Sequence, residues 1–247
     1  MNVPLREVEL IMMERSLAYD RAITIFSPEG RLYQVEYALE AVRRGKTAIG
    51  IKAANGAVIG VHKEATSPLM DLDQIQKIYT IDKHIGCAIA GLHADARVLV
   101  DFARVQSQIN QITYGEPIDV EVLTKKVCDL KQNYTQVGGI RPFGVSLLIG
   151  GADSQGPQIF TTDPSGSYWS WRATAIGYNS EAAREYLAKN YKPTIKLMPA
   201  AVKLCIDTLR QVVEEKLDEE AMEISIVDTE KREFTSLTKE EIRSVLE

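Results

Sequence analysis

The sequence predicts an α+β fold in which two antiparallel sheets stack on each other and helices cover the outer faces. Short apolar runs typical of strands are clustered and joined by tight turns, whereas segments with helical spacing come in pairs between the clusters. A regular strand–helix–strand alternation, which would indicate a parallel sheet, is absent. The 247 residues, 45% of them hydrophobic, can bury one sizeable core, and no linker or repeat divides them.

The stretch from Tyr19 to Gly45 contains a strand-like segment, a turn and a helix. Residues 22–26 are rich in β-branched and aromatic side chains. Residues 27–30, Ser-Pro-Glu-Gly, have the composition of a turn. Two arginines followed by Gly45 are typical of a helix C-terminus. Between the turn and the arginines, four apolar residues recur at helical spacing: Leu32, Val35, Leu39 and Val42.

Two strand pairs and two helices are expected next. Residues 47–51 and 57–61 flank an Asn-Gly dipeptide, the strongest short hairpin signal, and residues 75–81 pair with 85–90. The two helices are separated by Gly-Glu-Pro and should pack antiparallel on a sheet. In the first helix the apolar residues follow a three- or four-residue step: Val98, Phe102, Val105, Ile109 and Ile112.

The second half of the chain repeats this organisation. Residues 145–149 are a buried central strand, and 158–162 pairs with 168–174 across an Asp-Pro-Ser-Gly turn. Helices are expected over 180–190 and 198–217, and a strand over 224–227. Thr238 and Glu241 have the spacing of a capping box that opens a C-terminal helix.

Composition argues against several classes of protein. A net charge of −5 with both signs interspersed disfavours a nucleic-acid binder. No apolar run approaches the roughly 20 residues that span a bilayer, and the acidic N-terminus disfavours export. Cys87, Cys128 and Cys205 are far apart and odd in number, which favours reduced core thiols in a cytoplasmic protein. No histidine pairs with a cysteine at ligand spacing, so we expect neither a metal nor another cofactor.

The residues from Tyr19 to Gly45 resemble, in order and at motif length, the signature of proteasome α-type subunits. That signature is Tyr-Asp-Arg, then Phe-Ser-Pro-(Asp/Glu)-Gly-Arg, a Gln-Val-Glu-Tyr-Ala helix and a Gly-x-Thr strand. The resemblance implies a four-layer αββα sandwich, the fold of the N-terminal-nucleophile hydrolases. It also implies a non-catalytic α subunit of a 20S proteasome core of the archaeal kind, with a gating tail over residues 1–22 and a single domain over 23–247.

The same resemblance allows the catalytic alternative, a β-type hydrolase subunit, to be tested on the residues. Catalytic members expose a threonine, serine or cysteine at the head of the first core strand, where the freed amine activates it. Lys46 stands at that position and has neither a hydroxyl nor a thiol. Thr47 is displaced by one residue, which turns a strand side chain to the opposite face. His62 stands where β subunits carry a supporting aspartate. We therefore expect no catalytic residue.

The resemblance further implies three non-catalytic sites. The first is a gate that braces the open N-terminus, made of Tyr19, Asp20, Arg21, Pro28 and Tyr37. The second is a pocket for the C-terminus of an activator, made of Leu32, Gly45 and Lys77. The third is an axial constriction made of Val137, Gly138 and Gly139.

Each of these sites has a physical basis. Two phenols and a carboxylate can exchange hydrogen bonds between neighbouring subunits, and a lysine at the edge of a pocket can capture a terminal carboxylate. A glycine lets a backbone approach closely. Val137 replaces the tyrosine common in the family's constriction loop, which removes a hydroxyl from the expected pore. The plain alternatives are that Pro28 and Tyr37 only pack and that Lys77 is a solvated surface charge.

The implied partners follow from the family. They are other α subunits in a heptameric ring, proteasome β subunits, an AAA+ ATPase activator whose tails end in hydrophobic-tyrosine-X, and unfolded polypeptide in transit. No nucleic acid and no membrane is expected. A third possibility, besides the α subunit and the catalytic β-type subunit, is an assembly scaffold without a gate.

Overall fold

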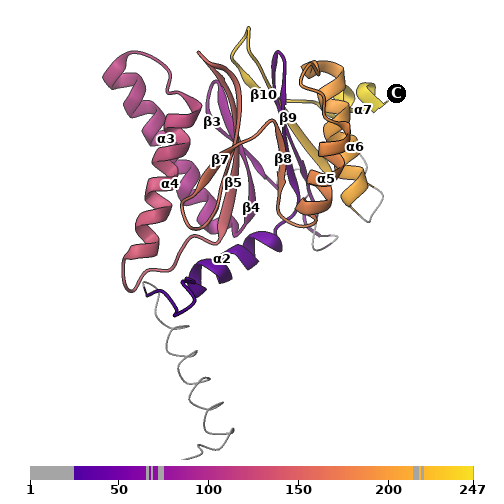
Figure 1. Ribbon diagram of the computed structural model, residues 1–247. Helices are drawn as coiled ribbons and strands as arrows, with labels where there is room; N and C mark the ends of the chain where they lie inside the picture. Colours follow the sequence, from indigo (N-terminus) through magenta and orange to yellow (C-terminus); the bar gives the residue numbers. More distant parts are fainter. Residues whose placement is uncertain are drawn as a thin grey trace, which may run out of the picture.

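Two five-stranded antiparallel sheets form the centre of the molecule, which a computed structural model describes over residues 25–64, 67, 69–71, 75–213, 217 and 220–246 (Figure 1). In order across the sheet, sheet A consists of β10 (Phe234–Ser236), β9 (Met222–Asp228), β2 (Gly56–His62), β1 (Ala48–Ala53) and β8 (Ala173–Ile176). Sheet B consists of β3 (Ile78–Asp82), β4 (Ile85–Gly91), β5 (Val145–Asp153), β6 (Gly156–Thr162) and β7 (Tyr168–Ser170).

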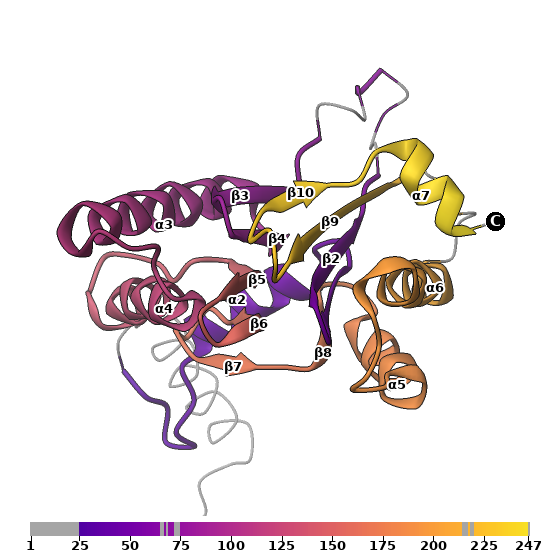
Figure 2. The same cartoon turned by 90° about the horizontal axis from the view of Figure 1, so that it is seen from above.

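Helices cover the outer face of each sheet, which gives the four-layer αββα sandwich that the sequence predicted (Figure 2). Sheet B carries α3 (His93–Tyr114) and α4 (Val120–Gln136), whereas sheet A carries α5 (Ser180–Asn190) and α6 (Val202–Val212). A short π-helical turn, η2 (Leu197–Ala201), precedes α6, and α7 (Lys239–Leu246) ends the described chain. The remaining helix, α2 (Tyr33–Arg43), lies across one end of the sandwich (Figure 1).

Three apolar clusters hold the layers together. Both faces of each sheet are buried, and successive strand residues point to opposite faces, so one strand contributes to two clusters. In β1, for example, Ile49 and Ile51 pack against the α5–α6 layer, whereas Ala48 packs between the sheets. This explains why the central strands are nearly continuous apolar runs instead of alternating ones.

Most of the predicted elements are confirmed. The Asn-Gly turn joins β1 to β2 in an antiparallel hairpin, and β5 is the central strand of sheet B. The capping box also forms: Thr238 N donates to Glu241 Oε2 at 2.8 Å, and Glu241 N donates to Thr238 Oγ1 at 3.2 Å. The three cysteines are free and buried.

Two predictions about elements were wrong, and one strand was missed. Residues 168–174 are not one strand, because β7 ends at Ser170 in sheet B and the chain then crosses to β8 in sheet A. The helix expected over 198–217 begins as the π-helical turn and ends at Val212, with Val213 extended. The strand β10, which is only three residues long, was not predicted.

The apolar stripe of α3 faces away from the sheet. The residues that α3 buries include three small ones and three larger ones: Ala96, Ala103 and Ser107, and Asp95, Leu99 and Val100. Of the predicted stripe, only Phe102 packs against the core. Val98, Val105, Ile109 and Ile112 are 50%, 54%, 48% and 84% exposed. Monomeric soluble proteins rarely expose contiguous apolar stripes of this kind.

Lys131 of α4 is completely buried at the contact between α4 and sheet B. Its ammonium donates to Val145 O and to Thr162 Oγ1, both at 2.9 Å, and so ties the helix to β5 and β6. Burial disfavours the charged form and lowers the pKa of Lys131 to about 8, from an ordinary value of 10.5.

We expect the stability of the folded chain to respond to pH through Lys131. Between pH 8 and 10.5 the unfolded lysine keeps its proton and the folded lysine has lost it, so stability rises with pH. The Lys131→Met variant lacks this pH-dependent contribution to the free energy of unfolding. Urea unfolding at about pH 8 and about pH 9.5, at one protein concentration, should therefore show wild type gaining about 1 kcal/mol per pH unit over the variant. Cys87 and Cys205, whose pKa values do not depend on Lys131, titrate alike in both proteins and cancel in the difference. Equal pH slopes would contradict the assignment.

Candidate functional site

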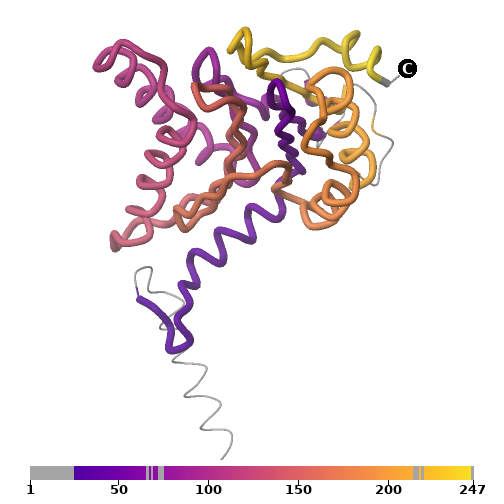
Figure 3. The backbone as a smooth tube through the Cα atoms, turned by 45° about the horizontal axis from the view of Figure 1, so that its top comes forward, coloured from indigo at the N-terminus to yellow at the C-terminus, as the bar shows by residue number. Residues whose placement is uncertain are grey.

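The helix α2 closes the end of the sandwich at which the first core strand begins. Gly45, just after the helix, lies against the end of β4: a Cβ placed on it would be 2.3 Å from Gly91 N. Further along the same contact, a Cβ on Gly144 would be 3.5 Å from Ala41 Cβ. The tube view shows α2 leading away from the sheets, with the described residues before it projecting beyond the sandwich (Figure 3).

The predicted turn before α2 is confirmed. Ser27 O accepts a hydrogen bond from Gly30 N at 2.8 Å, and Ser27 N donates to Arg31 O at 2.9 Å. Gly30 has a φ of +76°, a left-handed conformation that glycine adopts without a steric penalty. Pro28 therefore lies in a closed, hydrogen-bonded turn, as a bracing role would need.

The head of the first core strand carries no accessible nucleophile among the described residues. Lys46 forms an ion pair with Glu64. Thr47 is 3% exposed, and its hydroxyl donates to Tyr178 O at 2.6 Å. His62 is also buried. Glu64 thus neutralises the charge of Lys46, and the Thr47 hydroxyl is occupied by a buried hydrogen bond.

Lys77 lies in a cluster of charged residues and is not a solvated surface lysine. It is 8% exposed, and its backbone N donates to Glu223 Oε2 at 3.3 Å. Burial first, and then the charges of Lys46 and Lys63, lower the pKa of Lys77 to about 8, while Glu223 acts in the opposite direction. Lys77 is therefore mostly protonated at neutral pH and loses its charge under mildly alkaline conditions.

One chain does not bring the three predicted pocket residues together in one hollow. Leu32 and Gly45 flank opposite ends of α2, so about 20 Å of helix separates them. A hollow of about 550 Å³ lies beside α2 and includes Gly45 and Tyr37, but neither Leu32 nor Lys77. A pocket that uses all three residues must extend along α2 or be completed by a second copy of the chain.

The predicted constriction loop is clamped to the start of α3. Arg141 donates two hydrogen bonds to Asp95, at 2.6 and 2.7 Å, and Gly144 N donates to Asp95 Oδ2 at 2.8 Å. Burial alone would raise the pKa of Asp95, but the hydrogen bonds and the charge of Arg141 together lower it. Val137, which follows the last residue of α4 and opens the loop, is 47% exposed. Sequence reasoning missed Asp95, because nothing near it in the chain indicates a partner 46 residues away.

The predicted gate falls partly outside the described residues. Tyr19, Asp20 and Arg21 lie outside the described residues, and so does the tail over residues 1–22. Of the other gate residues, Pro28 lies in the turn and Tyr37 is 53% exposed on α2. The turn, α2 and the constriction loop all lie at the same end of the sandwich (Figure 1).

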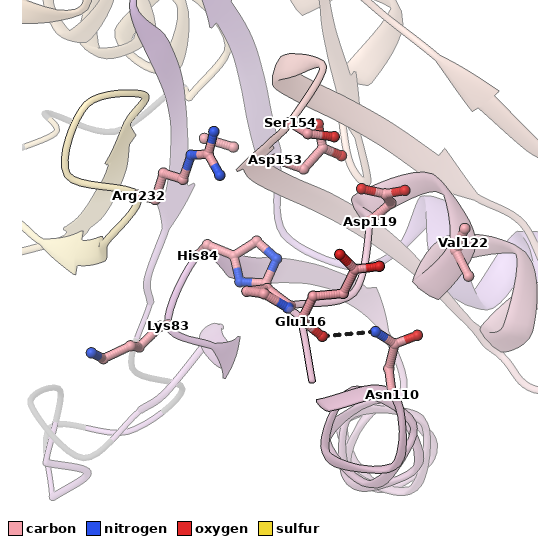
Figure 4. Close-up of a pocket in the computed structure, with 11 residues that line it drawn as sticks. Lys83, His84, Asn110, Glu116, Asp119, Val122, Asp153, Ser154 and Arg232 are labelled. Carbon is pink, nitrogen blue, oxygen red and sulfur yellow. Dashed lines mark hydrogen bonds between the residues drawn. The ribbon is translucent and has the colours of Figure 1, made fainter. Parts of the chain in front are cut away.

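A second cavity, of about 330 Å³, lies at the opposite end of the sandwich, among the turns that join the strands (Figure 4). Arg232 faces Asp153 and Asp119 across it, whereas the Lys83 side chain points away from these carboxylates. His84 lies at its centre, with Nε2 at hydrogen-bond distance, 2.8 Å, from Ile118 O. The cavity holds both charge signs, and none of the predicted site residues that the structure describes lines it.

The described residues include no group of three or more histidine, cysteine or acidic residues that could hold a metal ion. Within the same part of the chain, no helix is both long enough and apolar enough to cross a membrane.

Together with the four layers, the residues before β1 define a class of protein: one with the architecture of the N-terminal-nucleophile hydrolases in which a lysine, Lys46, stands just before the first core strand. Comparisons with known proteins narrow this class. A family model described as "Proteasome subunit" matches residues 42–227, and a second model, which describes the N-terminal signature of A-type proteasome subunits, matches residues 19–41.

Archaeal proteins named as the alpha subunit of the proteasome are similar over nearly the whole chain. The one from Methanosarcina acetivorans is 50% identical over 235 residues, which cover 95% of each chain. The one from Methanopyrus kandleri is 50% identical over 93% of this chain and 92% of its own. The protein named alpha 1 in Haloarcula marismortui is 50% identical over 91% of this chain and 86% of its own.

The chain belongs to the proteasome subunit family and is an α-type subunit of the 20S core particle. Subunits of the α type are generally non-catalytic, in agreement with Lys46 at the head of the strand. The β-type alternative is therefore set aside. Membership also implies assembly with other proteasome subunits.

Proposed function

We propose that this α subunit forms an outer heptameric ring on a ring of β subunits and gates the entry of unfolded polypeptide into the proteolytic chamber. It does so in the cytoplasm and opens when an AAA+ ATPase docks its hydrophobic-tyrosine-X tails. The observation that carries the proposal is the common location of the turn at Pro28, α2 and the constriction loop. A tail that precedes this turn starts at the same end of the molecule as the loop expected to line the channel.

The exposed stripe of α3 supports the assembly part of the proposal. It presents Val98, Val105, Ile109 and Ile112 on one side of a helix that already buries its opposite side against sheet B. Exposed apolar stripes of this length are stabilised when a partner covers them. In our proposal the partner is another proteasome subunit.

The clamp supports the channel part. A bidentate arginine–carboxylate pair fixes orientation as well as distance, so Asp95 and Arg141 hold the loop in one position. In our proposal, residues 137–139 are then presented as a fixed rim of the channel, and the tail over residues 1–22 acts as the gate. Opening and closing of such an element can limit the rate at which substrate enters.

Deletion of residues 1–22 tests the gate. We expect the deletion to raise hydrolysis of a short fluorogenic peptide several-fold in particles reconstituted with the β partner, because the barrier to entry is removed. The number of β active sites that react with a threonine-directed covalent probe should stay the same, which controls for assembly.

The deleted particle should also gain little from an activator peptide, because its entrance is already open. An unchanged basal rate in fully assembled particles would show that the tail does not gate entry. It would favour the alternative in which the subunit is an assembly scaffold without a gate.

A further inference from the structure

The carboxylate of Glu223 joins the start of β3 to a strand of the other sheet. Glu223 is the second residue of β9 and lies opposite Val61 of β2. Its Oε2 atom accepts a hydrogen bond from Lys77 N at 3.3 Å, although the two residues are 146 positions apart in the chain. The backbone N–H of Ile78, the first residue of β3, also stabilises the ionised form of this carboxylate.

This hydrogen bond fixes the backbone from which the Lys77 side chain leaves. Lys77 lies one residue before the ladder of sheet B, which begins in β3 with Ile78 opposite Ala88. Its backbone N–H therefore donates to a side chain of the other sheet and not to a neighbouring strand. The strand β9 is itself held on both sides, by β2 and by β10. A bond from this strand restricts the backbone torsions that set the direction of the flexible four-carbon side chain.

The cluster around Glu223 also carries an excess of positive charge. Lys46 and Glu64 neutralise each other as an ion pair, which leaves Lys63 and Lys77 beside Glu223. Burial raises the pKa of Glu223, while the N–H of Lys77 and the charge of Lys63 oppose this rise and favour the carboxylate. Two cations thus face one anion, and this excess favours the arrival of a further carboxylate.

We infer that Glu223 is a positioning residue of the activator pocket: it fixes the backbone at Lys77 so that the Lys77 ammonium can receive the terminal carboxylate of an activator tail. The inference rests on the proposed docking of such tails at Lys77. Holding the lysine in place before the tail arrives lowers the entropy cost of binding. Glu223 acts through Lys77, because its own negative charge repels a bound carboxylate.

Charge alone predicts the opposite effect of removing Glu223. A nearby negative charge weakens the binding of a carboxylate, so its loss would tighten the binding of the tail if Glu223 had no other role. If Glu223 fixes Lys77, its loss weakens the binding instead. The direction of the change therefore separates positioning from simple repulsion.

Particles reconstituted with the β partner test the inference. We expect Glu223→Ala to raise the concentration of activator peptide that gives half-maximal stimulation about tenfold at about pH 6.5, because the hydrogen bond that holds Lys77 is lost. Maximal stimulation and the basal rate should stay unchanged, since both the gate and the ammonium remain. Glu233→Ala makes the same change at an exposed residue beyond the far end of β9, and this matched control should behave like wild type.

A second variant keeps the charge and withdraws the acceptor. Glu223→Asp draws the carboxylate back by one carbon and should also raise the half-maximal concentration. It provides the same test if the alanine chain fails to assemble. Labelling of the β active sites with a threonine-directed covalent probe measures assembly in every case.

The pH dependence of stimulation is a readout that a general loss of packing would not move. Glu223→Gln keeps an acceptor oxygen for Lys77 N and removes only the negative charge. Since Glu223 raises the pKa of Lys77, the decline of stimulation with rising pH should occur at lower pH in Glu223→Gln than in wild type. Other ionisable side chains that act on this pair are the same in both proteins: Lys46, Lys63, Tyr79 and His93.

Unchanged or tighter binding of the peptide by assembled Glu223→Ala or Glu223→Asp particles would overturn the inference. The proposed function would still stand if Lys77→Ala abolished stimulation in the same assay. Full stimulation of the Lys77→Ala particle would overturn both the inference and the proposed docking at Lys77.

Discussion

Replacement of Lys77 by alanine is expected to abolish stimulation of the core particle by an activator peptide that ends in hydrophobic-tyrosine-X. The ammonium is the group that would hold the terminal carboxylate, and alanine offers no substitute. Peptide hydrolysis by reconstituted particles, with and without the activator peptide, measures the effect. Basal hydrolysis should remain, because Lys77 is not part of the gate.

A neighbouring lysine provides the matched control. Lys63 belongs to the same charged cluster, where it contributes to the pKa of Lys77, and it is similarly buried. Lys63→Ala removes one cation from this cluster and should leave most of the stimulation intact. Full stimulation of the Lys77→Ala particle would show that the carboxylate is held elsewhere.

The pKa of Lys77 adds a pH test to the same experiment. Since its pKa is about 8, the protonated fraction falls from most of the molecules at about pH 7 to a minority at about pH 9. Stimulation of wild type, normalised to the basal rate at each pH, should therefore decline as the pH rises through 8. A bound carboxylate favours the charged form and moves this decline to higher pH when the peptide is saturating.

Replacement of Gly45 by alanine is expected to have the largest effect on stability. The new Cβ would lie 2.3 Å from Gly91 N and 2.9 Å from Ala90 C, and both of these are backbone atoms that cannot turn aside. The end of α2 would have to separate from β4. We expect a loss of about 3 kcal/mol or more, which corresponds to a fall in Tm of about 10 °C for a domain of this size.

Gly138→Ala is the control for Gly45→Ala, because it makes the same chemical change where no atom lies within 4 Å. Its Tm in a thermal unfolding scan should equal that of wild type. A Gly45→Ala chain with unchanged Tm would mean that α2 is not packed against β4 as described. The result also bears on the activator pocket, since it separates a packing role of Gly45 from a role in binding a tail.

Some site residues can be predicted from their neighbours in the sequence, whereas others depend on contacts between distant segments. The turn at Pro28 and the helix after it could be read from the sequence, because proline, glycine and apolar spacing act over a few residues. The clamp of Asp95 on Arg141 could not, since the partners are 46 residues apart and neither has a local signature. The buried environment of Lys77 was also missed, because a lysine next to a strand is ordinarily solvated.

Strand assignment shows the same division. The Asn-Gly hairpin was predicted correctly, since its turn geometry is a local property. The run at 168–174 was taken as one strand because its composition is uniform, yet the chain changes sheets after Ser170. Which sheet a strand joins is decided by its pairing partners, and these are distant in sequence.

By itself, the sequence determined the order and type of most elements, the α+β class and the lysine just before the first core strand, whereas the four-layer arrangement was implied by the resemblance to proteasome subunits. These depend on periodicity, turn chemistry and the identity of single residues, which the chain carries locally. Only the tertiary structure decided which face of α3 is buried, which residues fix the predicted constriction loop and which sheet each strand joins. The spacing of four residues indicates an apolar face of the helix, whether or not the chain's own fold buries it: Val98, Val105, Ile109 and Ile112. Whether the protein's own sheet or another subunit covers that face depends on contacts between distant segments.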